Sequence, residues 1–290
     1  MSLRGVFAAA SAFALWGALV LYWDLLNGLS AFEILAHRIV WSLLCVWPLL
    51  LCTGRMHEVR AALHNKGTLL RICGSALLIG TNWCLYIYAV VTGHVLDASL
   101  GYYINPLSLA LLGFVLLGER PARMQVLAIA LAALGVVYSL VINGYIPWLA
   151  VSIALSFSLY GFIRKTVQLE AAPGVFLETA LLTPFALAWL VWLYSQGQLA
   201  FGSHNLQTDL LLVGGGPVTL VPLLLFTYAT RHITLITLGI LQYLSPTITL
   251  LLGLFVLQVK LEASVLVTFV FIWLALGLYT WNAWRFLHRK

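Results

Sequence analysis

Leu85-Tyr86-Ile87-Tyr88-Ala89 and Leu225-Phe226-Thr227-Tyr228-Ala229 are similar stretches that lie 140 residues apart in the chain. The same separation relates two further pairs, Pro106 with Pro246 and Gly113 with Gly253. A separation of 144 residues relates an earlier segment to a later one, through Phe13 and Phe157, Leu15 and Leu159, and Gly17 and Gly161. Because the matches keep their order along the chain, they predict that one structural unit is duplicated.

The composition places this unit in a membrane. Of the 290 residues, 62% are hydrophobic and 8% are charged, whereas soluble domains carry about 25% charged residues. A helix needs roughly 20 apolar residues to cross a bilayer, and only helices or closed barrels satisfy their backbone groups in lipid. We therefore predict an all-α integral membrane protein with ten spans, over residues 5–23, 32–52, 69–91, 97–117, 124–142, 146–164, 175–195, 209–229, 236–257 and 263–284.

The two copies are expected to be inverted. Residues 1–143 and 144–290 each hold five predicted spans, and an odd number makes the second copy enter the membrane from the opposite side. Inverted repeats of this kind, with a solute site where they meet, are typical of secondary transporters. The fold class is therefore ten transmembrane helices arranged as two inverted five-helix repeats.

The basic residues predict the orientation. With the N-terminus in the cytoplasm, 13 of the 15 lysines and arginines fall on the cytoplasmic side, and Arg38 and Lys260 are the exceptions. This bias follows the positive-inside rule and predicts that both termini are cytoplasmic. The +6 net charge is therefore an orientation signal, and no aromatic-basic pattern indicates a nucleic-acid partner.

Several strings resemble the EamA-type permeases of the drug/metabolite transporter superfamily, and most closely the RarD-like subgroup. They are Glu33-Ile34-Leu35-Ala36-His37-Arg38-Ile39-Val40-Trp41-Ser42, Gly80-Thr81-Asn82-Trp83, the run from Ala98 to Leu107, Leu116-Leu117-Gly118-Glu119-Arg120, the run from Ser158 to Lys165, and that from Thr268 to Trp273. The resemblance implies ten helices and solute export or exchange at a bacterial-type inner membrane. The chain departs from the family at Leu257-Gln258-Val259-Lys260, where an acidic residue is common, and at Asp97, where Glu is expected.

Polar side chains within the spans are costly, so they are candidates for function. Glu33 and His37 share one helical face, with Arg38 one step away. They form either a structural polar cluster or a proton-coupling site, for which His37 is the leading candidate because histidine titrates near neutral pH. Asp97 lies on a second polar face with Gly101 and Asn105. The run Gly214-Gly215-Gly216-Pro217 is expected to loosen the eighth span.

A solute pocket needs apolar or aromatic walls with a few placed polar groups. The sequence offers such residues on both halves, and each could also serve packing or lipid anchoring: Asn82, Trp83, Tyr86, Tyr102, Asn105, Tyr160, Gln242 and Tyr243. Glu178 occupies in the second half the place that Glu33 occupies in the first. We expect it to pair with Arg164 or Lys165 in a closed cytoplasmic gate.

The sequence therefore predicts a secondary transporter that moves a small amphipathic metabolite or drug by alternating access, with export as the expected direction. Proton antiport and facilitated diffusion are both compatible with it, and no cofactor or metal is expected. The alternatives are an intramembrane enzyme and a sensor or scaffold that does not transport. The chain has no HExxH or GxSxG motif, so we expect no enzymatic activity. The expected partners are the solute, lipid and, with antiport, protons, and the sequence leaves the oligomeric state open.

Overall fold

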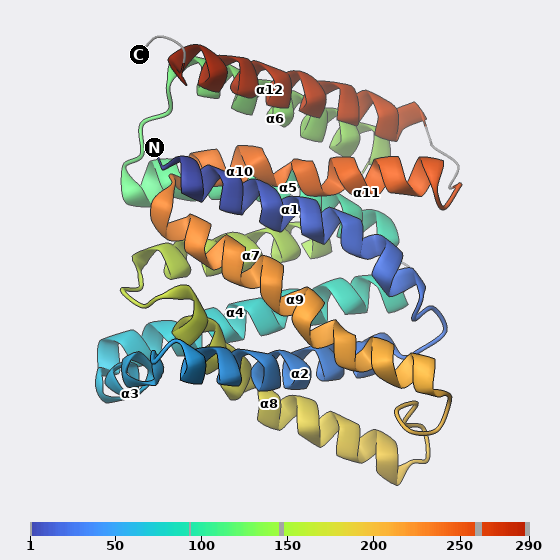
Figure 1. Cartoon of the computed structure of the whole chain (residues 1–290). Helices are drawn as coiled ribbons and strands as arrows, with labels where there is room; N and C mark the ends of the chain where they lie inside the picture. Colours follow the sequence, from blue (N-terminus) through green and yellow to red (C-terminus); the bar gives the residue numbers. More distant parts are fainter. Residues whose placement is uncertain (1, 93, 145–147, 259–262, 288–290) are drawn as a thin grey trace.

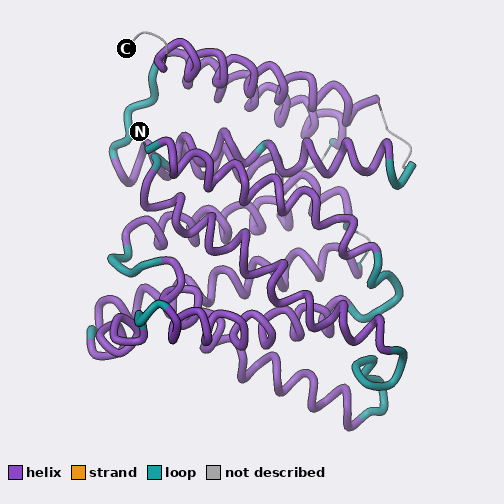
Figure 2. Tube along the Cα trace, viewed as in Figure 1, coloured by secondary structure: helices purple, strands orange, loops and turns teal. Residues whose placement is uncertain are grey.

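The computed structural model describes residues 2–92, 94–144, 148–258 and 263–287, and the side chains of a few helix residues, Asp97 among them, lie outside this description. The described residues form helices joined by turns and loops, and they contain no strand (Figure 2). The helices are α1 (Leu3–Asp24), α2 (Ala31–Cys52), α3 (Met56–His64), α4 (Lys66–Val91), α5 (Val95–Leu117), α6 (Arg123–Asn143), α7 (Trp148–Thr166), α8 (Ala171–Ser195), α9 (Leu206–His232), α10 (Leu235–Gln242), α11 (Leu244–Phe255) and α12 (Ala263–Leu287).

Each predicted span coincides with helix in its described residues, and the ninth is divided between α10 and α11. Residues 146 and 147 of the sixth predicted span lie outside the described residues. Within the described residues, eight helical segments are long and apolar enough to cross a membrane, and α12 contains a shorter apolar segment, Val265–Trp281. The chain is thus a multi-pass membrane protein, and the full number of ten spans stays a prediction. The short helix α3, between the second and third spans, was not foreseen.

The helices run side by side, and α1 begins at the same end of the bundle at which α12 ends (Figure 1). We call this the basic end, because α3 and the last turns of α7 and α9 lie there with Arg164, Lys165 and Arg231. The other end holds the connection between α8 and α9, residues 196–205, and we call it the distal end.

Helix neighbours come in pairs related by exchanging the two halves of the chain. α1 packs on α9 as α7 packs on α4, α2 packs on α9 as α8 packs on α4, and α1 packs on α11 as α7 packs on α5. In three further pairs, each helix packs on its own counterpart from the other half: α2 on α8, α5 on α10 and α6 on α12. In one of them, the Tyr243 hydroxyl donates to the Tyr103 carbonyl, 140 residues earlier in the chain, at 3.1 Å.

Glycines and prolines act differently from the prediction. α9 continues without a break through the glycine run, and a Cβ on Gly216 would lie 2.5 Å from the Cβ of Trp41. The run therefore lets α9 approach α2 and does not interrupt the helix. The interruption falls instead at Tyr243, between α10 and α11, because Pro246 has no N–H to donate to the carbonyl one turn earlier.

An aromatic cluster fills the space between α1, α7 and α9. Phe13, Phe157 and Phe226 are buried, and Trp16 packs against them with ring centroids 5.5 to 5.9 Å apart. The Tyr160 ring stacks on Phe226 with centroids 5.8 Å apart. These rings join α1, α7 and α9 in one apolar contact.

Candidate functional site

Arg38 lies within the distal half, in the second turn of α2, and meets side chains from three other helices. Its Nε donates to the Thr219 hydroxyl of α9 at 3.0 Å. Its guanidinium carbon lies 4.7 Å from the ring centroid of Trp23 on α1 and 5.4 Å from that of Trp83 on α4. The two indole faces and Thr219 fix the position of a charged group that would otherwise be flexible.

Two tyrosines face this guanidinium. The rings of Tyr86 on α4 and Tyr102 on α5 meet edge to face, with centroids 5.7 Å apart. These residues are 37% and 39% exposed, and both lie in the neighbourhood of Arg38. Arg38 is itself only half-buried. The site therefore combines accessible aromatic surface with one fixed positive charge.

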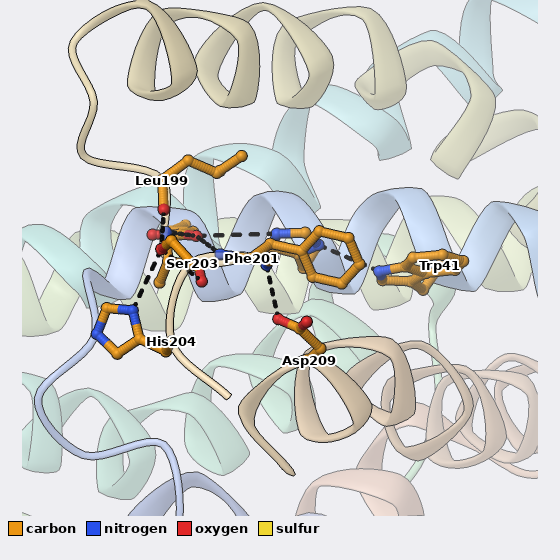
Figure 3. Close-up of polar contacts among 10 residues, drawn as sticks. Trp41, Leu199, Phe201, Ser203, His204 and Asp209 are labelled. Carbon is orange, nitrogen blue, oxygen red and sulfur yellow. Dashed lines mark hydrogen bonds and ion pairs between the residues drawn. The ribbon is translucent and has the colours of Figure 1, made fainter. Parts of the chain in front are cut away.

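A loop covers α2 at the distal end (Figure 3). Glu33 accepts hydrogen bonds from the backbone N–H groups of Ala200 at 2.8 Å and Phe201 at 3.2 Å, and Asp209 accepts one from Gly202 at 2.8 Å. Figure 3 shows Phe201 lying beside α2 near Trp41, and its ring centroid is 4.9 Å from that of His37. Glu33 and Asp209 thus hold the loop 199–204 in place, with Phe201 over the His37 ring.

The proton on His37 is fixed by its neighbours. Trp41 Nε1 donates to His37 Nδ1 at 3.1 Å, so that Nδ1 accepts and the single proton of the neutral ring lies on Nε2. Nε2 is buried 3.9 Å from Glu33 Oε1 and has no hydrogen-bond partner among the described residues. A second proton on His37 would break the bond from Trp41.

The basic half holds a buried ion pair. Arg164 Nε of α7 lies 3.6 Å from Glu178 Oε1 of α8, and both side chains are almost fully buried. Glu178 also accepts from the Ser75 hydroxyl at 2.6 Å and the Tyr160 hydroxyl at 3.3 Å. Gly174 leaves room for the guanidinium, because a Cβ there would lie within 2.6 Å of three Arg164 atoms.

Lys165 pairs with Glu119, so of the two partners expected for Glu178 only Arg164 is its partner here. Lys165 Nζ lies 3.7 Å from Glu119 Oε1 and donates to the Thr230 and Ile233 carbonyls at the end of α9. Glu119 accepts from the first backbone N–H groups of α10 as well. Glu119, Lys165, Ile233 and Ile236 are among the residues that line a pocket of about 410 Å³ at the basic end. Glu119 and Lys165 thereby connect the two halves.

A third ion pair closes the basic end, outside the predicted spans. Glu170 lies 2.9 Å from Arg231 and 3.4 Å from Arg55, so it connects α8 to α9 and to the turn after α2. Partial burial raises the pKa of Glu170, but the charges of Arg231 and Arg55 outweigh it, and the pKa lies below its ordinary value of 4.5.

The lowered pKa of Glu170 predicts that the folded protein loses stability in acid. A carboxyl with a lowered pKa stabilises the folded state fully above its unfolded pKa, and this contribution disappears as the pH falls through the folded pKa. We expect Glu170→Gln to be less stable than the wild type at pH 7, by no more than about 1 kcal/mol because the pair is partly exposed. The difference should shrink as the pH falls below 4.5 and through the folded pKa. Melting temperatures in detergent from pH 2.5 to 7.5 measure it, and a difference that stays constant over this range would contradict the assignment.

A sequence model of the EamA-like transporter family matches residues 3–141. The uncharacterized transporter YojE of Bacillus subtilis is 43% identical, over 96% of this chain and 94% of its own. Protein RarD of Escherichia coli K12 is 39% identical, over 97% and 95% of the two chains.

The chain belongs to the EamA-like transporter family. It is a multi-pass membrane transporter, as the resemblance in sequence implied. A further relative, at 30% identity over 99% of this chain and 97% of its own, is the chloramphenicol-sensitive protein RarD of Pseudomonas aeruginosa. A crystal structure with 17% identity superposes with a TM-score of 0.74, over 96% of this chain and 98% of the other, and shares the fold.

The candidate residues of this EamA-like transporter fall into two groups. Trp83, Tyr86 and Tyr102 gather around Arg38. The others face helix neighbours: Asn82 donates to the Ile153 carbonyl and Ser156, Asn105 accepts from Ser158, and Tyr160 and Tyr243 bond to Glu178 and Tyr103. Gln242 is buried, and its Oε1 has no partner among the described residues. The Asp97 side chain, Val259 and Lys260 lie outside the described part of the chain.

Sequence reasoning missed four residues with defined contacts: Trp23, Thr219, Glu119 in its capping role, and Glu170. Trp23 ends the first span, where tryptophan is ordinary for a membrane interface. Glu119 stands in a string that was noted only for its resemblance. Its partners are backbone groups 116 and 117 residues later in the chain, which no local pattern indicates.

Proposed function

We propose that this EamA-like transporter is a secondary transporter of the bacterial-type inner membrane. It exports a small amphipathic metabolite or drug by alternating access between two inverted repeats, residues 1–143 and 144–290. The observation that carries the proposal is the exchange relation among the main helix neighbours: α1 on α9, α2 on α9 and α1 on α11 have counterparts with the two halves swapped in α7 on α4, α8 on α4 and α7 on α5. Two halves that can exchange their conformations provide one state open to each side.

The basic end faces the cytoplasm in this proposal, with both termini there. The positive-inside bias supports that orientation, because α3 and the ends of α7 and α9 bring basic residues to one end of the bundle.

In this proposal the conformation described here is the one that is open toward the distal end. The exposure of Tyr86 and Tyr102, more than a third each, supports this, as does the burial of the Arg164–Glu178 pair in the basic half. Glu178 with Arg164, and Glu119 with Lys165, form the cytoplasmic gate. Opening it must separate these pairs and move α7 relative to α8 and α10.

His37 couples protons to this cycle. Because a second proton on His37 breaks the bond from Trp41, and Phe201 packs on both rings, protonation changes the support of the loop 199–204. Glu33 and Asp97 are the acidic groups that would exchange protons with this site.

Reconstitution into proteoliposomes tests the function. We expect saturable, protein-dependent uptake of at least one solute from a panel of chloramphenicol, aromatic amino acids and aromatic amines, and faster uptake into vesicles preloaded with that solute. Chromatography should recover the solute unchanged, which separates transport from an intramembrane enzyme. His37→Gln should abolish accumulation driven by a pH gradient and preserve exchange, whereas unchanged accumulation contradicts the coupling role. Absence of protein-dependent flux across the whole panel contradicts transport.

A further inference from the structure

Arg38 differs from the other cations within the bundle. Arg164 has Glu178 at 3.6 Å, and Lys165 has Glu119 at 3.7 Å with two backbone carbonyls. Arg38 has one hydrogen bond, from Nε to the Thr219 hydroxyl, and no carboxylate among the described side chains lies within ion-pair distance of it. A charged side chain in a membrane span is costly and is ordinarily paired or placed on a pathway for solutes or ions.

The neighbours of Arg38 hold its guanidinium in place and leave the two terminal nitrogens of that group accessible. Trp23 and Trp83 approach the guanidinium, with ring centroids 4.7 and 5.4 Å from its central carbon. The Nε bond to Thr219 fixes the plane of the group, and its two terminal nitrogens make no hydrogen bond to any described residue. Arg38 is only half-buried, so these donors can meet a ligand.

The chemistry of this arrangement selects the ligand. A guanidinium matches the two oxygens of a carboxylate with parallel hydrogen bonds. One fixed charge, with aromatic rings and tyrosine hydroxyls around it, suits a monoanion with an apolar or aromatic body better than a doubly charged phosphate. Tyr86 and Tyr102 offer that body accessible ring surface.

We propose that Arg38 binds the carboxylate of the transported solute, so that the solute class is an amphipathic monocarboxylate. This inference rests on the proposed transport function. It gives Arg38 a solute-binding role, whereas the sequence pattern placed Arg38 in a proton-coupling site or a structural polar cluster. Thr219 is a positioning residue, because it holds the guanidinium through Nε and leaves the other two nitrogens for the solute.

The test compares three carboxylates with their uncharged primary amides: benzoate, 3-phenylpropionate and indole-3-acetate. Melting temperatures of the purified protein in detergent are measured over a concentration series, at constant ionic strength. We expect at least one carboxylate to stabilise the wild type with an apparent affinity about 10- to 100-fold higher than its amide, the range of a charge-assisted bidentate contact. Equal effects of acid and amide, or no stabilisation by any of the three acids, would overturn the proposal.

Three variants assign the effect to the guanidinium. Arg38→Gln should remove the preference for the acid, and Arg38→Lys should reduce it about tenfold because the point charge lacks the fork. Arg60→Gln removes the same charge from the short helix α3 and should keep the preference. Retention of the preference in a folded Arg38→Gln protein would overturn the assignment.

Flux measurements separate this inference from the transport proposal. Acid-selective binding that depends on Arg38, without flux of any solute, would refute transport and leave the carboxylate site standing. Flux of uncharged solutes together with no preference for acids would leave transport standing and refute the carboxylate site.

Discussion

Replacing Arg164 by methionine is expected to lower the free energy of unfolding by about 3–5 kcal/mol, because it leaves the Glu178 carboxylate buried without its counter-ion. Neither side chain has appreciable contact with solvent, so water cannot substitute for the lost partner. Glu178→Gln should cost a similar amount, since it leaves the guanidinium unpaired and weakens the acceptor for Ser75 and Tyr160. Unfolding in mixed micelles, titrated with a denaturing detergent, measures both.

The matched control makes the same chemical change at the surface. Glu58 pairs with Arg55 at 3.8 Å in a partly exposed position, so Glu58→Gln should cost less than about 1 kcal/mol. The double variant Arg164→Met with Glu178→Gln should be more stable than the sum of the single losses predicts, by about 1–3 kcal/mol. Additive losses, or equal losses from Glu58→Gln and Glu178→Gln, would show that the buried pair is not coupled as described.

Gly216→Ala is expected to destabilise the protein by at least the ~1–3 kcal/mol typical of an overpacked core. The new Cβ would lie 2.5 to 2.8 Å from the Cβ, carbonyl carbon and carbonyl oxygen of Trp41, and two of these are backbone atoms that cannot turn away. α9 must then move from α2, which weakens the hydrogen bonds from Ser42 to the Gly216 carbonyl and from Arg38 to Thr219. We therefore expect lower solute affinity together with the lower stability.

Gly253→Ala is the control for this change. It lies inside α11, and a Cβ there would meet nothing within 4 Å. Alanine is a better helix former than glycine by about 1 kcal/mol, so this variant should be as stable as the wild type or more stable. The same unfolding titration compares the two variants. A similar loss in both would mean that the approach of α9 to α2 is not the cause.

Sequence patterns located most elements, because runs of apolar residues long enough for a bilayer have few structural alternatives. They could not give the partners of the polar residues. Glu33 and Glu178 occupy related places in the two halves, yet one holds a loop through its backbone and the other pairs with Arg164. The glycine run was expected to loosen the eighth span, but α9 is continuous there and the run packs against α2. A glycine has no Cβ in either case, so the sequence does not distinguish a loosened helix from a close approach of another helix.

The sequence alone determined that this chain is an all-helical membrane protein of the EamA-like kind. Hydropathy, charge bias and repeated strings are properties of local stretches of the chain, and they do not depend on how the helices pack. Only the tertiary structure decided that Asn82, Asn105, Tyr160 and Tyr243 bond to neighbouring helices, whereas Trp83, Tyr86 and Tyr102 surround Arg38. Such contacts depend on which helix faces which and at what height, and these are set by packing between residues far apart in the chain.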